Sequence, residues 1–117
     1  MNRQELIKSF EHIAPVKNVG QSYKHSDKPY IVLKEMIMTP DGNNSYGGYQ
    51  AYNLLCYVPD TSTAQLDDLV KAVRNRVFEL KEQGVESTGD LGEDFHDTDI
   101  KMYMKYVAIR VPQQIQM

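Results

Sequence analysis

The chain has 117 residues, of which 41% are hydrophobic and 25% are charged, and its formal net charge is −3 at pH 7. This is the length of one domain, residues 1–117, with enough apolar residues for one core. The mild negative charge argues against a nucleic-acid-binding protein, which normally carries a strongly basic face.

The single cysteine, Cys56, excludes an intramolecular disulfide and favours a reducing compartment. No apolar run approaches the ~20 residues that cross a membrane, so we expect no membrane partner. The charged N-terminus predicts no signal peptide, and we expect synthesis in the cytoplasm.

The first expected element is a short helix within residues 1–14. Apolar side chains recur there at helical spacing, at Leu6, Ile7, Phe10 and Ile13. Pro15 is expected to end this helix, because the residue before a proline is disfavoured in helical conformation. Residues 16–29 are polar, and we expect them to be irregular. Three lysines make the 17–28 segment basic; we expect them to be solvated, and contact with DNA stays open.

Residues 30–38 and 49–58 are rich in β-forming residues and predict two strands. The connection between them, "TPDGNNSYGG", is rich in turn-forming residues. We therefore expect an antiparallel hairpin with a long loop.

A long helix is expected after Pro59. Ser62 and Gln65 have the spacing of a capping box, and Gly84 is the expected left-handed stop. One apolar stripe predicts packing against a sheet: Leu66, Leu69, Val70, Val73, Val77 and Leu80. Lys81 is expected in the last turn.

The last third combines an acid-rich turn, residues 93–99, with one or two expected strands, the last of which ends near Pro112. Ile100, Met102, Met104, Tyr106 and Ala108 alternate with Lys101, Tyr103, Lys105 and Val107, which predicts one wetter face. Residues 113–117 are expected to be a flexible tail. The fold class is α+β: a small, mainly antiparallel sheet, with the core in residues 30–112 and both helices on one face.

The acid-rich turn raises the question of a metal site. Its candidate ligands are Glu93, Asp94, His96, Asp97 and Asp99. Their spacing is not that of an EF-hand, and zinc would need more His or Cys ligands than the lone His96. A hydrated turn is the favoured interpretation; a cation site stays an alternative, and we expect no cofactor.

No other pattern predicts catalysis. Cys56 lies inside a strand, where a thiol usually packs as a small hydrophobe. The Gly-rich string "DGNNSYGGY" lacks the lysine of a phosphate-binding loop. We therefore expect a protein that is not an enzyme.

Tyrosines gather near the long loop and the second strand: Tyr46, Tyr49, Tyr52 and Tyr57. Tyrosine is common both in cores and in protein interfaces. The sequence leaves open which of them contact a partner.

Two blocks carry a family resemblance. "YQAYNLLCYVPDTSTAQLDDLVKAVRNRVFEL", followed by "TGDLGEDFHDTDIKMYMKYVAIRVP", resembles the tail-terminator (minor tail or tail-completion) proteins of long-tailed bacteriophages and prophages. The resemblance spans about residues 30 to 112. It implies a hexameric ring, which can be monomeric in isolation, that caps the tail tube, meets the head connector and lets DNA pass. The expected location is the virion.

The resemblance implies no active site, only interface residues. Candidates in the long loop and the next strand are Asp41, Asn43, Tyr46 and Tyr49. The acid-rich turn could meet Arg74, Arg76 or Lys101 of a neighbouring subunit, and charge reversal at Asp97 and Asp99 should then weaken the ring. Another neck component, such as a head-closure or head–tail joining protein, is the nearest alternative, and a small metal-binding module or enzyme is the alternative from another class.

Overall fold

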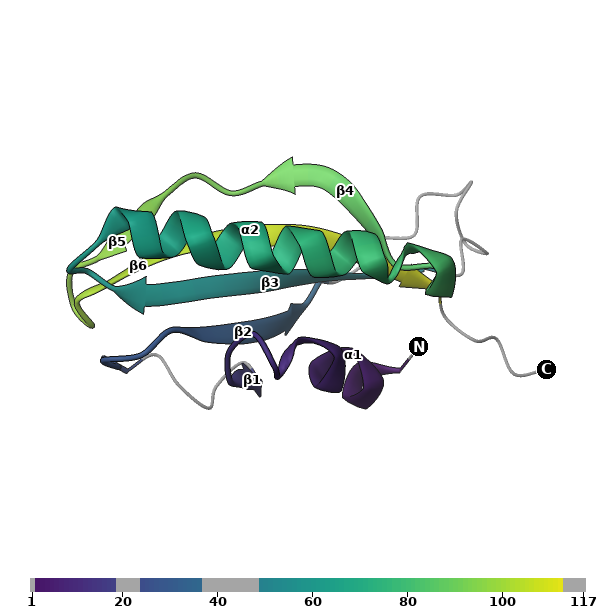
Figure 1. Cartoon of the computed structure of the whole chain (residues 1–117), viewed down its shortest axis with the longest axis horizontal. Coiled ribbons are helices and arrows are strands. Elements are labelled where there is room, and N and C mark those ends of the chain that lie inside the picture. The colour runs from purple at the N-terminus through teal and green to yellow at the C-terminus, as the bar shows by residue number, and fades with distance from the viewer. Residues whose placement is uncertain (1, 19–23, 37–48, 113–117) are drawn as a thin grey trace.

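The computed structural model describes residues 2–18, 24–36 and 49–112. In this part of the chain a six-stranded sheet carries two helices on one face (Figure 1). The expected α+β fold is confirmed. The elements in chain order are α1 (Arg3–Phe10), β1 (Val16–Asn18), β2 (Tyr30–Glu35), β3 (Tyr49–Pro59), α2 (Thr63–Glu79), the 3-10 helix η1 (Lys81–Gln83), β4 (Glu86–Leu91), β5 (Phe95–Asp97) and β6 (Met102–Pro112).

Strands β3 and β6 form the spine of the sheet. They pair antiparallel along their whole length, from Tyr49 opposite Pro112 to Pro59 opposite Met102. The strand order is β1-β2-β3-β6-β4, and β5 pairs with β6 beyond the end of β4. The expected hairpin of β2 and β3 is confirmed as an antiparallel pair. Only β1 is parallel to its neighbour, β2.

The main core lies between the sheet and the helices. All six residues of the expected α2 stripe are buried, which confirms that this helix packs on the sheet. Helix α1 joins the same core through Leu6 and Phe10. Its backbone is tied to α2, because Nε of Arg76 donates to the carbonyl oxygen of Ser9 at 2.8 Å.

Two expectations about helix α1 and its surroundings were wrong. The helix ends at Phe10, and turns occupy residues 11–13. Residues 16–29 are not wholly irregular, because β1 lies within them. After the helix ends, Pro15 lies beside β2. The carbonyl oxygen of Pro15 accepts a hydrogen bond from the backbone N–H of Ile31 at 2.8 Å.

The capping box that was expected on α2 lies on α1 instead. Ser62 is the N-cap of α2, but its side chain makes no capping hydrogen bond. In α1, Oδ1 of Asn2 accepts from the N–H of Glu5 at 2.8 Å, and the Asn2 N–H donates to the Glu5 carboxylate at 3.2 Å. Helix α2 ends before Lys81, which falls in η1, and the left-handed stop at Gly84 is confirmed by its φ of 89°.

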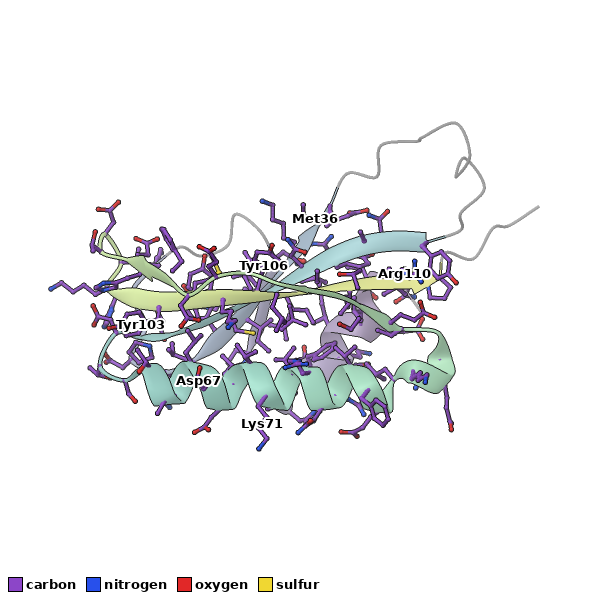
Figure 2. All side chains as sticks on the ribbon, turned by 90° about the horizontal axis from the view of Figure 1, so that it is seen from above. Met36, Asp67, Lys71, Tyr103, Tyr106 and Arg110 are labelled. Atoms are coloured by element: carbon purple, nitrogen blue, oxygen red, sulfur yellow. The ribbon has the colours of Figure 1, made fainter. Side chains whose placement is uncertain are left out.

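Both faces of β6 bury apolar side chains, so the expected division into a drier and a wetter face was wrong. Tyr103 points toward α2 and Tyr106 away from it (Figure 2). Val107, expected on the wetter face, is fully buried in the core beneath the helices. A second cluster occupies the other face, where the rings of Tyr30 and Tyr57 stack at 4.9 Å.

One or two strands were expected after α2, and the structure has three there: β4, β5 and β6. The first of them, β4, is irregular. It pairs with β6 at Ser87 and again at Leu91, but three of its residues lie opposite Ala108 alone. This bulge breaks the regular pairing, as bulges do at sheet edges. Strand β4 therefore arches away from the sheet above α2 (Figure 1).

Candidate functional site

The acid-rich turn is part of a hairpin made by β5 and β6, here called the acidic hairpin (residues 92–101). Asp97 holds its turn: Oδ1 accepts from the N–H groups of Asp99 at 3.1 Å and Ile100 at 3.4 Å. Lys101 completes the turn with a positive φ of 55°. The Asp97 carboxylate is thus a structural group in the folded chain.

Other side chains fasten the acidic hairpin to its own molecule. Nε2 of His96 lies 3.0 Å from Oδ2 of Asp60, just ahead of α2, and its ring lies 4.8 Å from that of Tyr103. Asp94 pairs with Lys105 of β6 at 3.4 Å. These contacts fix the hairpin at one end of the sheet (Figure 1).

The candidate metal ligands do not converge. Asp94, His96 and Asp97 each contact a different partner, namely Lys105, Asp60 and the turn backbone. No group of three His, Cys, Asp or Glu residues suited to a metal ion occurs in the described ranges. Within the described residues, the side chains of the hairpin therefore do not form a shared coordination site for a cation.

Exposed side chains of the acidic hairpin remain available to a partner, among them two acids, one large apolar residue and the cation Lys101. Glu93 and Asp99 are exposed, and neither makes an ion pair within the described part of the chain. Phe95 is 53% exposed although it is a large apolar residue. This surface therefore combines free negative charge with an aromatic ring.

A groove lies between α2, β4 and β6, where the bulge lifts β4. Its volume is about 890 Å³. Apolar residues in its lining are Val70, Val77, Phe78, Val85, Leu91 and Val107, and its charged residues are Asp67, Lys71, Arg74, Lys81, Glu86 and Lys105. Asp67 and Lys71 lie one turn apart on α2 (Figure 2).

The groove carries a net positive charge, because its unpaired cations outnumber Asp67, the one acid of its lining without an ion pair in the described residues. Glu86 is neutralised by Arg110 at 2.6 Å, and Lys105 by Asp94. Lys71, Arg74 and Lys81 make no ion pair with any residue that the structure describes. Phe78 lines the same groove and is 75% exposed.

Among these groove residues, only Arg74 was expected from the sequence to contact a neighbouring subunit. A signal was present, because residues 71, 74, 78 and 81 recur at helical spacing along one side of the buried stripe. The three cations and the phenylalanine on this exposed side of the helix could therefore have been identified from the sequence.

The remaining candidate residues lie in different places. Arg76 is partly buried and is occupied by Ser9 and by Glu79 at 3.3 Å, whereas Lys101 belongs to the acidic hairpin. Tyr49 is half-buried, with the Arg110 guanidinium 4.8 Å from its ring centre. Tyr52 and Tyr57 are buried in the two cores. Asp41, Asn43 and Tyr46 lie outside the described residues.

Cys56 is buried beneath the helices, and burial raises the pKa of its thiol to about 12. Its Sγ lies 3.7 Å from the Leu54 carbonyl oxygen. A thiol in this state is an inert core group, as expected. His25 and His96 have other partners.

Neither described helix combines the length and apolar character needed to span a bilayer. No protein-family model matches the chain, and no curated protein or solved structure is significantly similar to it.

Proposed function

We propose that this chain is a structural assembly protein of a long-tailed bacteriophage or prophage. It acts as a tail terminator: copies form a ring, hexameric in the family that residues 30–112 resemble, which caps the tail tube and joins it to the head connector. Its work is done by contact between surfaces, without covalent chemistry. Its place is the virion, at the junction of tail and head.

The observation that carries this proposal is the presence of two different and complementary surfaces. The acidic hairpin lies at one end of a molecule 48 Å long (Figure 1), and the basic groove lies between α2, β4 and β6. Different patches that fit each other make head-to-tail contacts, which close into a ring when the rotation per subunit allows it. A self-complementary patch would instead stop at a dimer.

A ring also suits the physical task of termination. A growing tube stops when its last ring is covered by a subunit that presents no further tube-binding face. The covering ring needs one face for the tube protein, another for the connector, and a central opening for DNA. An antiparallel sheet with helices on only one face gives each subunit two chemically different sides.

Electron microscopy of tube assembly tests the proposal. The tail-tube protein of the same genome is polymerised with and without this chain carrying a gold label. We expect shorter tubes with label at one end. Tubes of unchanged length, with label absent from the ends, would contradict the proposed function.

A further inference from the structure

We propose that the groove between α2 and β4 binds the acidic hairpin of a second copy of this chain, with Phe95 of one copy packing beside Phe78 of the other. This inference deepens the ring contact of the proposed function and takes its biological setting from it. The contact itself is argued from the charges and exposed side chains of the two surfaces.

The charges of the two surfaces match. Lys71, Arg74 and Lys81 in the groove have no ion pair within the described residues, and the same holds for Glu93 and Asp99 of the hairpin. Opposite charges on two surfaces steer encounter and fix the register of docking. Leaving them unpaired in each monomer costs little in water, so they are free to pair between copies.

The aromatic rings match as well. Phe78 and Phe95 are the two large hydrophobic side chains that are exposed in the described part of the chain. One lies in the basic groove and the other on the acidic hairpin. Aromatic residues, phenylalanine included, are enriched in protein interfaces. The groove, at about 890 Å³, is large enough to take such a side chain.

The sheet geometry keeps Phe95 out of the groove of its own molecule, although the neighbouring Asp94 pairs with Lys105 of the groove lining. Phe95 lies directly opposite Met104 in the β5–β6 pair, so both side chains are on the same face of the sheet. Met104 packs on the cluster facing away from the helices. The groove opens on the α2 side, so Phe95 can reach only the groove of another copy.

A charge-swap experiment tests the contact. The groove variant is Lys71→Glu with Arg74→Glu, and the hairpin variant is Glu93→Lys with Asp99→Lys. By sedimentation velocity we expect each variant to associate with itself at least about tenfold more weakly than the wild type, which corresponds to two unmade charge pairs. An equal mixture should regain association, because reversed groove then meets reversed hairpin. Asp97 is left unchanged because it holds the turn.

The matched control is Lys8→Glu with Lys34→Glu. Both lysines are exposed, neither lines the groove, and the net charge changes by the same amount as in the groove variant. We expect this control to associate like the wild type. Equal weakening in control and groove variant would assign the effect to net charge and overturn the proposal.

A disulfide measurement tests the placement independently of these variants. Phe78→Cys and Phe95→Cys are introduced into separate copies; the native Cys56 is buried and does not compete. We expect the mixture to form a cross-linked heterodimer at least about tenfold faster than Phe78→Cys mixed with Lys34→Cys.

Equal cross-linking rates would overturn the proposal, as would a wild type that stays monomeric at millimolar concentration. Either result would leave the tube-capping experiment free to succeed, with ring closure then depending on the tube or on another protein. The failure of this inference is thus distinguishable from failure of the proposed function.

Discussion

The His25 ring is placed between two hydrogen-bond acceptors. Nδ1 lies 3.0 Å from the carbonyl oxygen of Ile100, and Nε2 lies 3.1 Å from Oδ1 of Asp27. A neutral imidazole has only one N–H and can satisfy only one of them, whereas the imidazolium donates to both. Asp27, and after it the Ile100 carbonyl, therefore raise the pKa of His25 above its ordinary 6.5.

This pKa direction predicts a pH dependence of stability. Because the folded pKa is above the unfolded one, the His25 contribution is full below about pH 6.5 and is lost as pH rises through the folded value. Replacement of His25 by Gln should therefore lower the melting temperature more at pH 6 than at pH 8.

NMR titration of the His25 ring gives the direct measurement. Asp27→Asn is the control and should bring the pKa back toward 6.5, since it removes the largest cause of the shift. A wild-type pKa at or below that value would contradict the assignment.

Gly84 is required by both its backbone and its surroundings. Its φ is +89°, and a Cβ at this position would lie 2.6 Å from Cγ of Pro112. We expect Gly84→Ala to lower the free energy of unfolding by roughly 1–3 kcal/mol, measured by urea denaturation.

Gly89 is the matched control for Gly84. Its φ is +80°, but a Cβ there would meet nothing within 4 Å. Gly89→Ala should carry the backbone strain alone and cost less than Gly84→Ala. Equal losses would show that the contact with Pro112 has no energetic weight.

At the scale of elements, replacement by alanine should have a large effect on stability at Leu66 and a small one at Phe78, although both residues lie on α2. Leu66 is 1% exposed in the main core, so Leu66→Ala should cost about 2–5 kcal/mol of unfolding free energy. Phe78 is 75% exposed, so Phe78→Ala should stay within about 0.5 kcal/mol. Calorimetry of both variants checks this; a large loss at Phe78 would mean that its ring stabilises the monomer.

Elements whose signal lies in their own residues were predictable. The stripe of α2 has the helical period, and Gly84 marks the end of the helical segment, so both were expected correctly. Strands β2 and β3 are long runs of β-forming residues, and their antiparallel pairing was expected correctly.

Elements defined by their neighbours were not predictable in this way. Strand β1 has only three residues, of which Val16 alone favours a strand, and it exists through its pairing with β2. Strand β4, "ESTGDL", has a glycine and polar residues, and its bulge depends on the register with β6. The groove was missed for the same reason, because one wall of it is β4.

At the scale of the whole molecule, the sheet lies between the groove and Phe95 of the acidic hairpin. The groove lies on the side of α2, and Phe95 shares the opposite face with Met104. A copy can therefore present its hairpin to one neighbour while its groove receives the hairpin of another. This arrangement extends beyond a pair of subunits, as a ring requires.

Salt should distinguish the electrostatic part of this contact from the apolar part. Exposed charges are screened over about 10 Å at 0.1 M salt and about 3 Å at 1 M, whereas burial of an aromatic ring is not weakened by screening. We expect wild-type self-association, measured by sedimentation, to weaken steadily as sodium chloride rises between these concentrations.

Phe78→Ala should associate more weakly at every salt concentration, but its association should fall with salt at the same slope as that of the wild type, because its charges are intact. The Lys71→Glu, Arg74→Glu variant should show the opposite slope and associate more strongly as salt rises, because its acidic groove repels the acidic hairpin and salt screens that repulsion. Association that strengthens with salt in the wild type would mean that the rings alone hold the copies together, and that the charges of the groove and the hairpin serve another purpose.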